Sequence, residues 1–103
     1  MIIINNNNIN SMMVKILELF WINWSKGIKL ILSDGENREE IGGVRKTKNG
    51  FDAWAKTFGY DPGRAIKGLN SLDEGREFVE SFQPWDLYDL GRGLVVEPDV
   101  RNE

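Results

Sequence analysis

Two runs of apolar residues dominate the hydrophobic pattern of the chain. The first is Val14–Ile22 and the second is Ile28–Leu32, with polar residues and Gly27 between them. Many of these side chains are β-branched or aromatic and suit a pleated surface, so we predict a β-hairpin. Because a short apolar run does not by itself separate strand from helix, a helix over Val14–Ile22 followed by one strand is the alternative.

Turn-forming dipeptides bound a third segment. Asp34-Gly35 and Asn49-Gly50 accept the positive φ angles of tight turns. Between them, Arg38–Lys46 predicts a short, edge-like third strand, in which Gly42-Gly43 marks a bulge or a close backbone approach.

The pattern then changes to helical spacing. Apolar residues in Phe51–Phe58 recur three and four positions apart, which predicts a helix. A second helix is expected over Pro62–Leu69, since Asp61 suits an N-cap and Pro62 suits a first turn.

A third helix is predicted over Leu72–Phe82. It opens with a capping box, in which Glu74 follows Ser71 by three residues, and Pro84 ends it. The side chains expected to point inward are Leu72, Phe78, Val79 and Phe82.

Together these elements predict an α+β fold. A small antiparallel sheet from about Val14 to Lys46 is packed by two to three short helices, and Leu94–Val96 is a candidate C-terminal strand. We expect residues 1–12 to be a disordered Asn-rich tail, residues 13–98 a single domain and residues 99–103 a polar end. Charged residues interrupt the apolar stretch, so we expect no membrane span. The absence of cysteine fits the cytosol, and we expect a cytoplasmic protein.

The sequence contains neither cysteine nor histidine. It therefore has no thiolate nucleophile and lacks the usual general base and commonest metal ligand at neutral pH. The adjacent carboxylates Glu39-Glu40 and Asp73-Glu74 suit solvated or capping positions, and no glycine-rich stretch has the Lys-Ser/Thr pair of a phosphate loop. We predict a protein that is not an enzyme and that holds no cofactor and no metal.

Charge is distributed unevenly along the chain, whose formal net charge is −3. Residues 1–34 carry a net +1, residues 35–70 a net +2 and residues 71–103 a net −6. Such asymmetry indicates either separate binding surfaces or two solvated faces that attract each other.

The basic middle of the chain suggests a nucleic-acid hypothesis. Two short helices over Ala53–Leu69, with Gly59 at the turn, would form a helix-turn-helix-like unit. The cations that would meet DNA are Arg45, Lys46, Lys48, Lys56, Arg64 and Lys67. An ordinary helical pair with a solvated basic face explains the same pattern. Stacking of single-stranded bases on Trp24, Trp54 or Trp85 ranks below duplex binding, because tryptophans are more often core residues.

The segment FQPWDLYDL suggests a protein-docking surface. Tryptophan and tyrosine anchor interfaces and acids tune the choice of partner. The candidate docking residues are Trp85, Asp86, Leu87, Tyr88 and Asp89. The alternative is that this segment folds back and covers a small core. We predict a small non-catalytic module, an adaptor, inhibitor or regulatory subunit, that docks on a larger protein, with DNA binding as the alternative.

Overall fold

The central feature of the fold is a meander of five antiparallel strands. The computed structural model describes residues 2–4, 14–57, 60–88 and 94–103. The meander consists of β3 (Glu18–Trp24), β4 (Gly27–Ser33), β5 (Arg38–Thr47), β6 (Gly50–Thr57) and β7 (Tyr60–Leu69). A short strand, β8 (Val100–Arg101), pairs in parallel with β3 and completes a mixed sheet in the order β7-β6-β5-β4-β3-β8.

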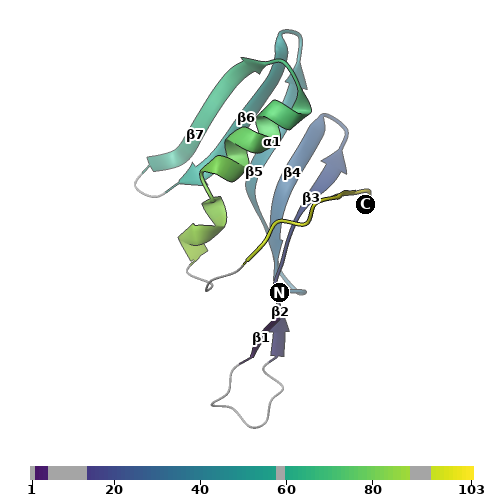
Figure 1. Cartoon of the computed structure of the whole chain (residues 1–103), viewed down its shortest axis with the longest axis vertical. Helices are drawn as coiled ribbons and strands as arrows, with labels where there is room; N and C mark the ends of the chain where they lie inside the picture. The colour runs from purple at the N-terminus through teal and green to yellow at the C-terminus, as the bar shows by residue number, and fades with distance from the viewer. Residues whose placement is uncertain (1, 5–13, 58–59, 89–93) are drawn as a thin grey trace.

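Two further elements complete the architecture. The helix α1 (Leu72–Ser81) packs on one face of the sheet, mainly across β5 and β6, and the 3-10 helix η1 (Pro84–Tyr88) follows it (Figure 1). The strands β1 (Ile2–Ile4) and β2 (Val14–Ile16) form a separate two-stranded sheet that extends away from the larger one (Figure 1). Most of the predicted Asn-rich tail, at residues 1 and 5–12, lies outside the described residues.

The predicted fold class is wrong, because it has too many helices and too few strands. Instead of a small sheet with two to three helices, the structure has a six-stranded sheet and one α-helix in the described chain. The helices predicted over Phe51–Phe58 and Pro62–Leu69 are wrong, since residues 51–57 belong to β6 and residues 62–69 to β7. Phe58 lies outside the described residues. The cause is an ambiguous pattern: Ala53 and Ala55 are buried and the other residues of β6, Trp54 between them included, are half-buried, so strand alternation fits as well as helical spacing.

Of the other predicted strands, some are found in the structure and some are not. The N-terminal hairpin is confirmed for the part of its first strand that starts at Glu18, because β3 and β4 pair in register from Glu18↔Ser33 to Trp24↔Gly27. The first residues of the predicted strand, Val14–Ile16, form β2 and pair with β1 instead. The third strand exists but is neither short nor at an edge, since β5 spans ten residues and lies between β4 and β6. Leu94–Val96 is not a strand; the chain joins the sheet only later, at β8.

The close backbone approach expected at Gly42-Gly43 is confirmed, and a bulge lies beside it at Ile41. The β4–β5 register shifts between Leu30 and Ile31. A Cβ on Gly42 would come within 2.5 Å of Val79 Cγ1, so glycine at this position lets α1 approach the sheet.

The start of α1 is confirmed in most of its detail. The Ser71 hydroxyl accepts from the Glu74 N–H at 3.1 Å, as a capping box requires. The Glu74 carboxylate accepts from the N–H of Asn70 at 3.0 Å. Two side chains predicted to face inward are instead exposed, Leu72 at 36% and Phe82 at 39%, because the sheet covers a strip of the helix centred on Gly75 and Val79.

The hydrophobic core lies between α1 and the sheet. Trp21 is fully buried there, and its indole N–H donates to the Glu80 carboxylate of α1 at 2.7 Å. The fully buried side chains Leu30 and Ile41 lie in the same cluster as Trp21 and Val79. We call the other side of the sheet, which α1 does not cover, the open face.

Candidate functional site

The open face contains two adjoining hollows. The first, which we call the tryptophan groove, has a volume of about 420 Å³ and is lined by Trp24 and Trp54 together with Lys29, Arg45 and Lys67. The second, which we call the basic hollow, has a volume of about 480 Å³. Arg45, Asp52 and Lys67 line both, so the hollows form one continuous surface.

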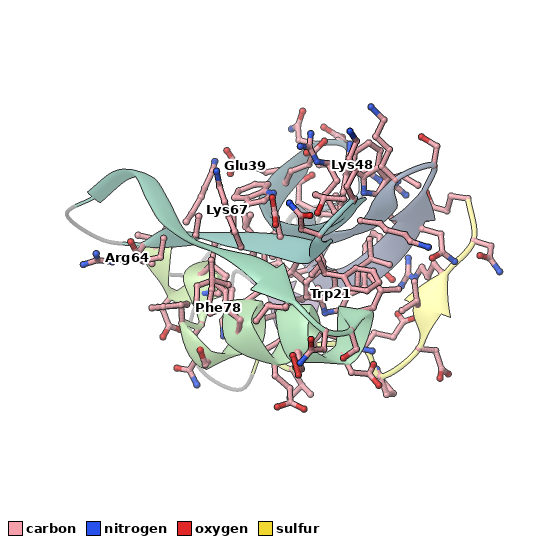
Figure 2. All side chains as sticks on the ribbon, turned by 90° about the horizontal axis from the view of Figure 1, so that it is seen from above. Trp21, Glu39, Lys48, Arg64, Lys67 and Phe78 are labelled. Carbon is pink, nitrogen blue, oxygen red and sulfur yellow. The ribbon has the colours of Figure 1, made fainter. Side chains whose placement is uncertain are left out.

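Strand alternation explains why these side chains share a face. Val44 is in the core, so its neighbours Gly43 and Arg45 point to the open face. The β5–β6 register places Trp54 opposite Gly43 and Asp52 opposite Arg45. Figure 2 shows Lys48 and Lys67 on the side of the sheet away from α1, while Trp21 lies between the sheet and the helix.

The indole of Trp54 rests on Gly43. A Cβ at position 43 would lie 2.7 Å from Trp54 Nε1 and 3.3 Å from its Cε2, closer than a side chain allows. Glycine at this position therefore allows the indole ring to pack directly on the backbone. Trp54 remains half-buried, so part of it is available to a ligand.

Trp24 is held differently. The Nζ of Lys29 lies 4.6 Å from the centroid of its ring, a cation–π distance, and the same Nζ pairs with the Glu40 carboxylate at 3.1 Å. The Trp24 indole N–H is buried and has no acceptor in the part of the chain that the structure describes. Packing and Lys29, rather than a hydrogen bond of its N–H, therefore fix this ring.

Three cations around the basic hollow are not neutralised. Arg45, Lys48 and Lys67 are exposed and take part in no ion pair among the described residues. The carboxylate in the hollow, Asp52, accepts from the Gly68 N–H at 3.2 Å. The hollow therefore has a local surplus of positive charge, although the whole chain is acidic.

The opposite side of the molecule has the opposite charge. The helix α1 carries four carboxylates and a single cation, Arg76. The carboxylates are Asp73, Glu74, Glu77 and Glu80. Arg76 is itself paired with Glu80 at 2.9 Å. The basic hollow and the acidic helix thus lie on opposite sides of the sheet.

The structure brings together only part of the predicted nucleic-acid set. Arg45, Lys48 and Lys67 meet at the basic hollow. Lys46 is opposite Phe51, which packs on the core, so alternation places it on the other face. Lys56 pairs with Glu39 at 3.4 Å, and Arg64, which is opposite Ala55 in the middle of β7, lines neither hollow.

The predicted helix-turn-helix-like unit is wrong. Residues 53–57 belong to β6 and residues 60–69 to β7, and the two strands pair antiparallel. No recognition helix exists in this segment, and its cations reach their positions through a β-hairpin.

The predicted docking segment lies on η1. Pro84 is fully buried, Trp85 is half-buried against the core cluster, and Asp86 is exposed. Leu87 is half-buried, Tyr88 ends η1, and Asp89 lies outside the described residues. Packing on the core gives Trp85 a role in the fold, and docking through this segment stays a prediction.

Other kinds of site find no support in the described chain. Its acidic residues include no group of three or more that could hold a metal ion. No described helix is both long and apolar enough to span a membrane.

Comparison with known proteins adds no identification. The chain matches no protein-family model, no curated protein and no solved structure. The geometry of the open face is therefore the basis on which a function can be proposed.

Stacking of single-stranded bases on Trp24, Trp54 or Trp85 was predicted only as a lower-ranked possibility. The grouping of Trp24 and Trp54 with Arg45 and Lys67 on one face was not predicted. Counting by twos from the buried Val44 and Ala53 would have placed Arg45 and Trp54 on the same face.

Proposed function

We propose that the protein binds single-stranded nucleic acid on its open face and catalyses no reaction. Proteins that bind single strands combine cationic surfaces for the phosphates with aromatic side chains on which bases stack. The tryptophan groove has two indoles, three cations and two carboxylates in its lining. One of the cations, Lys29, is paired with the carboxylate of Glu40, which leaves Arg45 and Lys67 for a phosphate. This combination in one groove is the observation that carries the proposal.

The polarity of the molecule supports the proposal despite the net charge of −3. The carboxylates of α1 lie behind the sheet, so they repel a polyanion from the helix side while the cations of the open face attract it. A strand approaching the molecule is thereby directed toward the two indoles.

A single strand fits this face better than a duplex does. Stacking on an indole requires a base whose flat surface is free, and in a duplex those surfaces are covered by neighbouring bases. The one α-helix in the described chain is acidic on its first turn and covers the sheet, so it offers no basic helix to a major groove.

The experiment that tests the proposal is fluorescence anisotropy with labelled oligonucleotides. Single-stranded DNA and RNA of about 12 nucleotides, and a DNA duplex of the same length, are titrated at about 50 mM salt and then at rising salt. Both single strands should bind more tightly than the duplex, and the affinity should fall as salt rises. The DNA and RNA arms show which sugar the face prefers.

Two variants connect binding to the groove. Trp54→Ala should weaken single-strand binding by about 1–3 kcal/mol, roughly 5-fold to 150-fold, while Trp54→Phe retains a ring and most of the affinity. Phe82→Ala removes an exposed aromatic side chain from the other side of the molecule and serves as the matched control. Absence of single-strand binding at low salt, or unchanged affinity of Trp54→Ala, would contradict the proposal.

A further inference from the structure

We infer that the basic hollow is a phosphate-binding subsite, which fixes how a single strand lies across the open face. This inference rests on the proposed function and specifies it. It places a backbone phosphate among Arg45, Lys48 and Lys67 and the adjoining base over the tryptophan groove.

The three cations reach the hollow from three parts of the fold. Arg45 comes from β5, Lys48 from the turn between β5 and β6, and Lys67 from β7. None has a carboxylate partner among the described residues, whereas Lys29 and Lys56 on the same sheet are paired with Glu40 and Glu39. Unpaired cations that converge on one hollow provide the charge that a phosphate requires.

The turn that carries Lys48 is held in place. The Thr47 hydroxyl accepts from the Asn49 N–H at 3.2 Å and lies 3.3 Å from the Gly50 carbonyl oxygen, to which it donates. Gly50 has a φ of +125°, and a Cβ there would come within 2.3 Å of the Leu69 carbonyl oxygen. The backbone of the hollow is therefore fixed by local contacts without a ligand.

Asp52 gives the subsite a distinguishing property. Its carboxylate bonds the Gly68 N–H and thereby ties β6 to β7 at the hollow, but its negative charge opposes a phosphate. Asp52→Asn keeps an oxygen acceptor for Gly68 and removes the charge. This substitution should therefore raise the affinity for a single strand, with a gain that disappears at high salt.

The main test is the salt dependence of oligonucleotide binding. Each phosphate contact contributes about 0.7 to the slope of log K against log salt for a single strand. The variant with Arg45→Ala, Lys48→Ala and Lys67→Ala should therefore lose about 0.7 from the slope, since the hollow holds one phosphate. Arg45→Ala alone should lose part of that amount, and its neighbour Lys46→Ala, which removes the same charge from the other face, should lose almost none.

Two further probes separate phosphate recognition from base stacking. An abasic oligonucleotide of the same length should retain the part of the slope that depends on the three cations and should lose the effect of Trp54→Ala. Inorganic phosphate, compared with chloride at equal ionic strength, should shift the NMR amide signals of Lys48, Asn49 and Gly68. These arms distinguish a nucleic-acid phosphate from free phosphate.

The outcomes separate failure of the subsite from failure of the proposed function. Oligonucleotide binding with an unchanged slope in the triple variant would overturn the subsite and leave single-strand binding intact. No oligonucleotide binding, but phosphate-specific shifts at these amides that the triple variant lacks, would overturn the proposed function and support an anion site. No oligonucleotide binding and no phosphate-specific shift would overturn both.

Discussion

The two faces of the sheet both contain tryptophans, but these differ in burial and in hydrogen bonding. On the helix side, Trp21 is fully buried and its indole N–H has an acceptor, the Glu80 carboxylate at 2.7 Å. On the open face, Trp24 and Trp54 line a groove and are only half-buried. Trp21 and Trp24 are three positions apart on one strand, an odd spacing that places them on opposite faces. Their position on the strand, rather than their chemistry, separates a core residue from a candidate binding residue.

The charged residues show the same contrast. Arg76 on the helix side bonds Glu80 and the carbonyl oxygens of Glu97 and Pro98, so it holds the C-terminal segment against α1. Arg45 and Lys67 on the open face have no such partners in the described ranges. A cation that stabilises the fold is paired within the fold, and an unpaired cation beside exposed aromatic rings is suited to an external anion.

The open face is itself divided into two parts. At the β3 end, Phe20 is fully buried beneath two guanidinium groups, with Arg101 at 3.7 Å and Arg38 at 5.4 Å from the ring centroid. Both of these arginines are paired with carboxylates: Arg38 bonds Glu103, and Arg101 bonds Glu97 and Glu18. The C-terminal segment therefore closes this end of the face and leaves the tryptophan groove as its open part.

The largest expected effect is on the tryptophan of the core. Trp21→Ala should lower the free energy of unfolding by about 3–5 kcal/mol, because it empties a fully buried site. Trp54→Ala should lower it far less, since Trp54 lies half-exposed on the surface. Urea unfolding measures both values, and similar losses for the two variants would contradict the contrast between the faces.

Two adjacent glycines, Gly42 and Gly43, allow the two faces of the sheet to be compared at neighbouring positions. Gly42→Ala forces a methyl group to 2.5 Å from Val79 Cγ1 in the core and should destabilise the protein by about 1–3 kcal/mol. Gly43→Ala displaces the Trp54 ring on the open face, so its main effect should be weaker oligonucleotide binding. Unfolding and anisotropy measurements on both variants test this, and equal effects of the two substitutions on affinity would reject it.

The ion pairs at the β3 end of the open face should make the free energy of unfolding depend on pH in the acidic range. Arg101 lowers the pKa of the Glu97 carboxyl, and Arg38 lowers the pKa of the Glu103 carboxyl, each through a hydrogen bond to the carboxylate. The folded protein binds these two protons less readily than the unfolded chain does. Their stabilisation is complete above the ordinary value of 4.5 and is lost as pH falls through the lowered pKa values.

Urea unfolding at a series of pH values below neutrality measures this dependence. Glu97→Gln removes one of the two carboxylates, so its stability should decline less steeply than that of the wild type below pH 4.5. Parallel curves for the two proteins would show that the ion pairs of the C-terminal segment do not stabilise the fold.

The smallest expected effect is on the ion pair at the edge of the tryptophan groove. The Lys29 and Glu40 side chains are 28% and 51% exposed, so solvent screens their attraction. Glu40→Gln should change the free energy of unfolding by less than about 1 kcal/mol. A larger loss would show that this pair, with Lys29 over Trp24, belongs to the structural part of the sheet.

Local chemistry made some of the fold predictable. The N-terminal hairpin, the close approach of the backbone at Gly42-Gly43 and the Ser71 cap follow from turn, glycine and capping preferences that act within a few residues. The helices predicted over Phe51–Leu69 were wrong, because pairing of β6 with its neighbours decided between two patterns that the sequence fits equally well. Pro62 suits the result, since β7 is an edge strand in which a missing N–H is tolerated.

The candidate site was less predictable than the fold. The tryptophans and cations that line it come from β3, β4, β5, β6 and β7, and only the strand register brings them together. Alternation from Val44 and Ala53 predicts which side chains share a face once the strands are assigned correctly. The helical assignment of Phe51–Leu69 prevented that step.

The most direct test of the account is an NMR titration of the labelled protein with a single strand of about 12 nucleotides. The account predicts shifts of the Trp54 indole N–H and of the amides of Gly43, Arg45 and Lys67, while the outer residues of α1, such as Glu77, stay unchanged. Shifts confined to α1 or to the Trp85 segment, or no shifts at low salt, would contradict the claim that the open face is the binding surface.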